Sequence, residues 1–108
     1  MTEDEKKSRN QMPEIDRLIH EPARFNIMAL LYMIESADFT FIQNQIQLTS
    51  GNLSSHLTKL EAAGYLEIVK AFVNRKPRTM LKLTGAGREA FDKYRQQMKH
   101  TFEGIPDS

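Results

Sequence analysis

The segment Thr49–Ile68 reads TSGNLSSHLTKLEAAGYLEI and contains the pattern that decides the fold. Leu53, Leu57 and Leu60 recur at helical spacing, so they predict a helix with a single apolar stripe facing a core. Gly64 stands where a helix ends on a residue in the left-handed conformation. We therefore expect a helix over residues 50–63, packed on the rest of the domain by its leucines.

The outer face of this helix carries short uncharged polar side chains, where long charged ones would make a better solvated surface. Short hydroxyl and amide groups reach phosphates and base edges at close range, whereas long charged side chains would hold the helix out of a DNA groove. Asn52 is suited to pair with adenine, and Gly51 allows the backbone to approach a phosphate at the helix N-terminus. The alternative is a solvated face that begins with the capping residue Thr49 or Ser50. The helix residues expected at DNA are Thr49, Ser50, Gly51, Asn52, Ser54, Ser55, His56 and Lys59.

The residues before this segment predict a second helix joined to it by a tight turn. Thr40 and Gln43 have capping-box spacing, which predicts a short helix over residues 41–47 with Phe39 in a short edge strand before it. Two helices joined by a tight turn form a helix-turn-helix unit, whose second helix fits the major groove of DNA.

The residues after this segment predict a β-hairpin. Residues 65–72 and 79–83 are rich in β-branched and apolar side chains, and the polar stretch VNRKPR lies between them. We therefore expect a wing-like hairpin with a basic, extended tip over residues 73–79.

The charge of this hairpin has a single sign, since residues 70–82 hold five cations and no acid. Arg75 is the candidate for a narrow minor groove, and Lys76 and Arg78 are candidates for phosphates. Asn74 completes the expected contact set at the tip. The alternative is a charged tip that only keeps the hairpin soluble.

Flanking helices complete the expected domain. Pro22 suits the first turn of a helix whose core stripe is Ile27, Leu30, Leu31 and Ile34, and Thr84 would cap a last helix. Both helices also carry apolar side chains outside the predicted core stripe. In the first helix, these side chains either pack on the terminal segments or contact a second subunit. We expect a homodimer, because one recognition helix reads few base pairs. The interface residues expected are Phe25, Met28, Tyr32, Tyr94, Met98 and Phe102.

These motifs together resemble the winged-helix transcription regulators of the MarR/ArsR type over about residues 20–95. The resemblance rests on LSSHL (53–57), LEAAGYL (60–66), the hairpin, and Leu83-Thr84 with Gly87-Arg88. It implies an α+β, mainly α fold with a three-helix core, a two- to three-stranded wing and a C-terminal helix over residues 13–102. Residues 1–12 would be disordered and residues 103–108 a flexible tail. The implied function is a sequence-specific double-stranded DNA-binding regulator, expected to be a repressor; the alternative is a winged-helix protein–protein module.

The composition excludes several other classes. The 108 residues contain no cysteine, so thiolate metal ligands are absent, including those of the arsenic-sensing branch. His20, His56 and His100 fall in different expected elements without metal-ligand spacing, and His56 is either a DNA contact or packed under the wing. No catalytic trio or phosphate loop occurs, so we expect neither an enzyme nor a cofactor. No apolar run is long enough for a membrane span and no signal peptide is evident, which favours the cytoplasm. The sequence leaves any small-molecule effector open.

Overall fold

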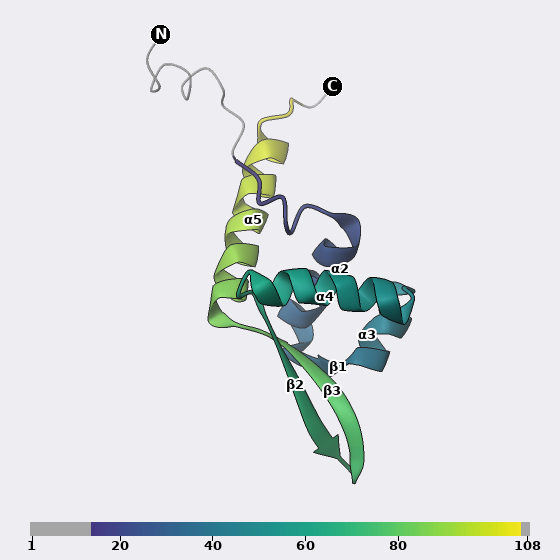
Figure 1. The fold of residues 1–108 in the computed structure, drawn as a ribbon. Coiled ribbons are helices and arrows are strands. Elements are labelled where there is room, and N and C mark those ends of the chain that lie inside the picture. The colour runs from purple at the N-terminus through teal and green to yellow at the C-terminus, as the bar shows by residue number, and fades with distance from the viewer. Residues whose placement is uncertain (1–13, 107–108) are drawn as a thin grey trace.

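The computed structural model describes residues 14–106, in which a helix-turn-helix unit is followed by a long β-hairpin and a final helix (Figure 1). The expected disordered segment 1–12 lies outside the described residues, as do residues 107–108 of the expected tail. The elements are α2 (Pro22–Ile34), β1 (Ser36–Asp38), α3 (Phe39–Ile46), α4 (Ser50–Ala62), β2 (Leu66–Val73), β3 (Lys76–Leu83) and α5 (Gly85–Glu103).

Helix α4 forms as its leucine spacing predicts. Leu53, Leu57 and Leu60 are buried, and the side chain of Thr49 caps the first turn by accepting a hydrogen bond from the Asn52 amide at 3.1 Å. Gly64 has a φ of 81°, and its amide donates to the carbonyl of Glu61 while the next amide reaches back to Leu60. These paired bonds are a Schellman motif, which favours glycine because of the positive φ.

Helix α3 begins two residues earlier than the capping-box spacing indicates. The Asp38 carboxylate accepts a hydrogen bond from the Phe41 amide at 2.8 Å, so Asp38 is the cap and the predicted Thr40–Gln43 box is wrong. Phe39 consequently belongs to the helix, and the short edge strand ends at Asp38. Gln47 adopts a left-handed conformation with φ 60° and supplies the tight turn into α4.

The three strands form one antiparallel sheet in the order β1-β3-β2. The hairpin strands continue further than expected, since Val73 pairs with Lys76 and the turn is Asn74-Arg75 alone, both with positive φ. This two-residue turn matches type I′, whose twist suits a hairpin. Pro77 lies inside β3. Val73 and Lys76 form the hydrogen-bonded pair next to the turn, so the next pair, Phe72 and Pro77, is a non-hydrogen-bonded one. The nitrogen of Pro77 therefore points away from β2, and no ladder bond is lost there. β1 pairs only as far as Met80, so no bond is lost on that side.

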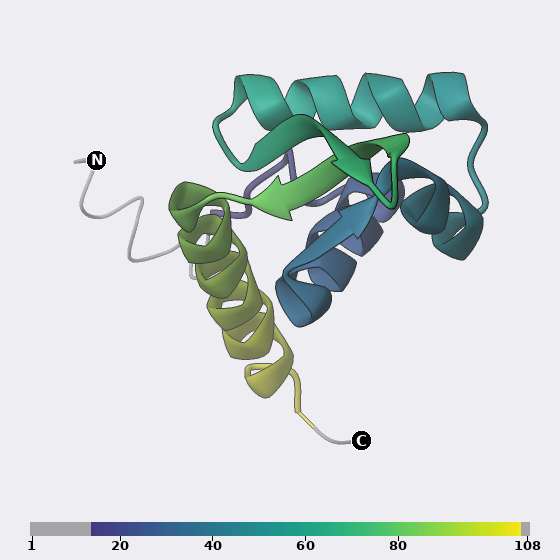
Figure 2. The ribbon, with the colours of Figure 1, turned by 90° about the horizontal axis from the view of Figure 1, so that it is seen from below.

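The core lies where α2, α3 and α4 meet the inner face of the sheet. Helix α2 buries Ile27, Met28 and Leu31, so the expected stripe is rotated; Ile34 is 40% exposed at the end of the helix. Helix α5 packs Phe91 and Tyr94 against this body and then extends beyond it (Figure 1). Figure 2 shows α4 along one side of the hairpin and α5 on the other, with no element over the outer side of α4.

Candidate nucleic-acid interface

The outer face of α4 is exposed and polar, as the sequence predicted. Within residues 14–106, the side chains of Asn52, Ser54 and Ser55 form no hydrogen bond to protein atoms. The Thr58 hydroxyl instead donates to the carbonyl of Ser54 at 2.9 Å, one turn back in the helix. Several hydrogen-bonding groups on this face therefore remain available to a ligand. The exposed residues of the predicted set on this helix and its cap are Thr49, Ser50, Gly51, Asn52, Ser54, Ser55 and Lys59.

The first turn of α4 offers backbone amides to an anion. The Thr49 side chain and carbonyl accept from the amides of Asn52 and Leu53, which leaves the amides of Ser50 and Gly51 outside the hydrogen bonds of the described chain. Gly51 is helical without a positive φ, and a Cβ placed there would meet nothing within 4 Å. Neither packing nor backbone conformation requires this glycine, although glycine in a helix costs about 0.5–1 kcal/mol relative to alanine.

His56 lies at the flank of α4 and contacts the start of α2. An Arg24 guanidinium nitrogen lies 3.1 Å from His56 Nδ1, and the same arginine donates to the Leu18 carbonyl at 2.6 Å. A guanidinium group only donates, so Nδ1 accepts and the neutral ring carries its proton on Nε2. The side chain is 21% exposed, so His56 packs mainly on α2 and not under the wing.

Glu21 completes this polar cluster. Its carboxylate caps α2 by accepting from the amides of Ala23 and Arg24, and it lies 3.7 Å from His56. Partial burial acts to raise the pKa of Glu21, but the two amide hydrogen bonds and the positive charge of Arg24 outweigh it and lower that pKa. Arg24 was absent from the predicted site; its position before a core stripe gave no signal of a contact with α4.

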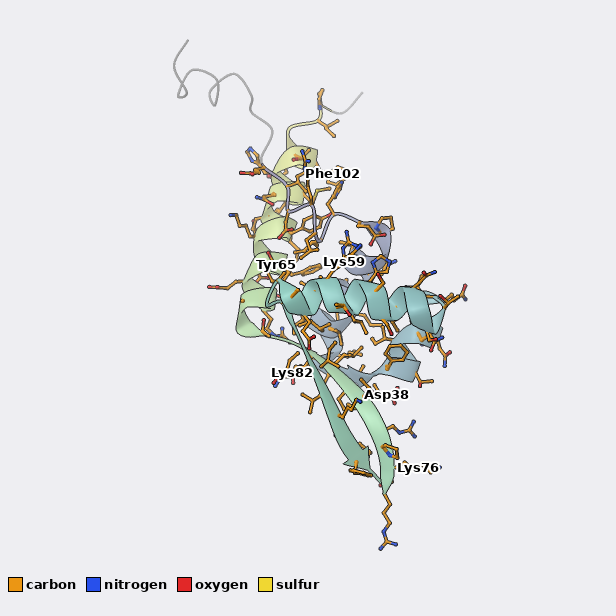
Figure 3. All side chains as sticks on the ribbon, in the orientation of Figure 1. Asp38, Lys59, Tyr65, Lys76, Lys82 and Phe102 are labelled. Carbon is orange, nitrogen blue, oxygen red and sulfur yellow. The ribbon has the colours of Figure 1, made fainter. Side chains whose placement is uncertain are left out.

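The hairpin tip presents unpaired positive charge. Asn74, Arg75, Lys76 and Arg78 are exposed, and none of these cations, nor Lys59, takes part in an ion pair within the described part of the chain. Figure 3 shows Lys76 at the far end of the hairpin and Lys59 on α4, while Phe102 lies at the opposite end of the molecule.

The junction between α4 and the hairpin is held by hydrogen bonds from several elements. The Tyr65 hydroxyl donates to Asp16 at 2.8 Å, and the Tyr65 carbonyl accepts from the Thr84 amide at 3.1 Å. The Thr84 hydroxyl donates to the Gly64 carbonyl at 2.5 Å while its oxygen caps α5 through the Gly87 amide. Asp16 and Thr84 therefore fix the orientation of α4 relative to the hairpin.

Most of the residues expected at a dimer interface surround one groove. This groove, of about 550 Å³, lies between the start of α2 and the last turns of α5, and Phe25, Tyr94, Met98 and Phe102 line it. Met28 instead is fully buried in the core, so it has no surface to offer a second subunit. Tyr32 of α2 lies outside this groove and contacts α5, where its hydroxyl donates to Asp92 at 2.6 Å and its ring packs under Arg88 and Arg95.

Among residues 14–106, no group of three or more histidine, cysteine or acidic side chains is placed to hold a metal ion. Within the same residues, no helix has the length and apolar character needed to cross a membrane.

The chain matches the model of the winged helix DNA-binding domain over residues 23–102, and it belongs to that family. This match confirms the fold class expected from the sequence. A transcriptional regulator homologue from Pyrococcus horikoshii has a TM-score of 0.78 and 30% identity, covering 95% of this chain and 97% of that one. An uncharacterised protein of Methanocaldococcus jannaschii is 37% identical over 78 residues, 72% of this chain and 85% of its own length.

Regulators of the MarR-like kind are among the similar solved structures, which confirms the resemblance drawn from the motifs. NadR, solved in complex with 4-hydroxyphenylacetate, has a TM-score of 0.68 and 26% identity. The alignment covers 82% of this chain and 62% of NadR. The chain is thus a DNA-binding regulator by family and by fold.

Proposed function

We propose that this protein is a sequence-specific double-stranded DNA-binding repressor that acts as a homodimer in the cytoplasm. Helix α4 lies in the major groove, and the hairpin tip contacts the adjacent minor groove and backbone. One observation carries this proposal. The outer face of α4 is uncovered and carries short polar side chains, and the same domain presents a hairpin tip whose cations form no ion pairs within the described residues.

Gly51 supports a close approach of α4 to DNA. It lowers helix stability without serving packing or backbone conformation, and its amide adjoins the open N-terminus of α4. A glycine with no role in the fold is explained if a phosphate contacts the backbone there, because a side chain would hold that phosphate away. Asn52 and Ser55, in the first two turns, are then the residues that read base edges.

His56 fits a contact with the DNA backbone. With Nδ1 occupied by Arg24, the Nε2 proton of the neutral ring is left to donate to a phosphate at the flank of α4. Lys59, Arg75, Lys76 and Arg78 supply the remaining charge. If four cations per subunit each neutralise one phosphate, the logarithm of affinity falls with that of salt at a slope of about −3.6 per subunit.

The groove between α2 and α5 fits a second copy of the chain. Phe102 is 65% exposed and Phe25 is 38% exposed at this apolar groove, on the side of the molecule away from the hairpin. Burying these rings against a two-fold partner would remove the apolar surface and place two α4 helices on successive half-sites. Light scattering at micromolar concentration tests this, and a stable monomer would contradict it.

The test of DNA binding is selection from a random double-stranded library by the full-length protein, followed by affinity measurements at several salt concentrations. Asn52→Ala with Ser55→Ala should reduce discrimination between the selected and scrambled sequences. Arg75→Ala with Lys76→Ala should weaken binding to both sequences and flatten the salt slope. Matched controls are Ser36→Ala on β1 and the α5 pair Lys93→Ala with Lys99→Ala, which should change neither property. Failure of the wild type to retain any duplex near physiological salt would favour a protein–protein module.

A further inference from the structure

Phe72 is an apolar residue with no role in the core of this protein. Its side chain is 79% exposed, more than that of any other large apolar residue in the described chain. It lies near the end of β2, where its cross-strand partner is Pro77. The surrounding hairpin carries only positive charge from residue 70 to residue 82. A large exposed apolar ring surrounded by polar residues is typical of an interaction site. Because the surrounding charges are positive, the expected partner is negatively charged.

The pairing register places Phe72 on the face of the sheet that α4 occupies. Side chains alternate along a strand, so Phe72 shares a face with Lys70 and Ile68. Ile68 in turn lines a hollow with Ser54 and Thr58 of α4. Phe72 therefore points to the side of the hairpin that also carries the recognition helix, further out along the hairpin.

The reach of the hairpin matches the spacing of DNA grooves. Phe72 is four residues beyond Ile68, which places it about 13 Å further out at ~3.3 Å per residue. A full turn of duplex DNA is about 34 Å long, so neighbouring grooves lie about 17 Å apart. With α4 in the major groove, the ring of Phe72 is thus at the height of the adjacent minor groove.

We propose that Phe72, supported by Pro77, enters this minor groove as an apolar wedge that partly unstacks one base step and bends the duplex. The proposal rests on the mode of binding proposed above and adds a residue outside the polar and cationic set. Apolar wedges enter minor grooves at steps that unstack easily, so the selected sites should carry a pyrimidine–purine step at the flank of the region contacted by α4.

The positive charge of the hairpin favours DNA over a second copy of the chain as the occupant of this face. Lys70 lies on the same face as Phe72, and Arg75, Lys76 and Arg78 surround the tip. Two such hairpins brought face to face would oppose like charges, whereas phosphates on both sides of a minor groove neutralise them. A change in oligomeric state on substitution of Phe72 would therefore contradict the proposal.

The test compares Phe72→Ala and Phe72→Leu with Val69→Ala. Val69 is 44% exposed on the same strand but on the opposite face, so it is a matched control. Selection from a random duplex library is repeated with each variant, and energy transfer between end-labelled fragments measures the bend. Thermal unfolding and light scattering establish that the variants keep their fold and mass.

The wild type should bend its selected duplex and enrich a flanking pyrimidine–purine step. Phe72→Ala should lose both and bind about tenfold more weakly, because burial of a phenyl ring is removed. Phe72→Leu should retain part of the bend, and Val69→Ala should behave as wild type. If Phe72→Ala keeps the bend and the flanking preference, the wedge is refuted while the proposed function stands. If the wild type selects no duplex, both are refuted.

Discussion

Replacement of Gly87 by alanine should destabilise the protein strongly, because α5 touches the backbone of the α4–hairpin junction at this residue. A Cβ at position 87 would lie 2.1 Å from the carbonyl oxygen of Tyr65 and 2.9 Å from its carbonyl carbon. Both atoms are backbone, so no change of rotamer relieves the overlap. Gly87 is itself buried in the first turns of α5.

The magnitude follows from the displacement that the overlap demands. The contact must open by roughly 1 Å or more to reach van der Waals separation. This movement strains the 3.1 Å hydrogen bond from the Thr84 amide to Tyr65 and loosens α5 on the core. Overpacking of this kind costs about 1–3 kcal/mol or more, and the helix propensity of alanine offsets less than ~1 kcal/mol. We expect the free energy of unfolding to fall by about 2–3 kcal/mol, or ~10–20 °C in melting temperature.

The assay is urea unfolding followed by circular dichroism at several protein concentrations, since the proposed dimerisation would contribute to apparent stability. Gly85→Ala is the matched control, because Gly85 begins the same helix and a Cβ there would meet nothing within 4 Å. That variant should be as stable as wild type or slightly more stable. Equal unfolding midpoints for Gly87→Ala and Gly85→Ala would refute the reasoning from close approach.

Three further predictions concern the junction and the tip. The hydrogen bond to Asp16 and partial burial raise the pKa of Tyr65, so this contribution to stability is present below its unfolded pKa and is lost as pH rises through the folded value. Unfolding measured from pH 7 to 11 should therefore show a smaller alkaline loss in Tyr65→Phe than in wild type, and equal losses would contradict this assignment. Thr84→Ala should lower the free energy of unfolding by about 1–2 kcal/mol in urea titrations, because it removes both the cap of α5 and the bond to Gly64, while Thr84→Ser should retain most of it. Arg75→Gly should raise thermal stability by up to about 1 kcal/mol, because glycine accepts a φ of 64° without strain, yet weaken DNA binding in titrations; tighter binding would show that the Arg75 charge is not used.

The sequence predicted the elements whose signals are local. The leucine stripe of α4, the cap at Thr49 and the left-handed Gly64 depend on residues within one or two turns of each other, and all three are present. The hairpin and its basic tip were predicted too, but the two-residue turn was not, because the polar stretch with Pro77 looked like a loop. Pro77 is tolerated in β3 since its nitrogen faces a side where β1 has ended, a fact of tertiary pairing.

The parts that were not predicted depend on contacts distant in sequence. Met28 and Ile34 both fit an apolar face of α2, and only the position of the neighbouring elements decides that Met28 is in the core. The approach of Arg24 to His56 spans 32 residues and has no periodic signal. The candidate DNA-binding face was found from residue types, whereas the polar cluster behind it required the structure.

The hydrogen-bonded joint at Gly64 and Tyr65 has a consequence for how target sites are distinguished. Three residues with bonded amides, Ala63, Gly64 and Tyr65, join α4 to the hairpin. Thr84 and Asp16 form further hydrogen bonds to Gly64 and Tyr65, so we expect α4 and the hairpin to move as one stiff body. Little conformational entropy remains to be lost when such a body docks, which favours affinity. If α4 and the hairpin bind DNA as proposed, the adjustment falls on the duplex, and we expect base pairs that the protein never touches to affect binding through their flexibility.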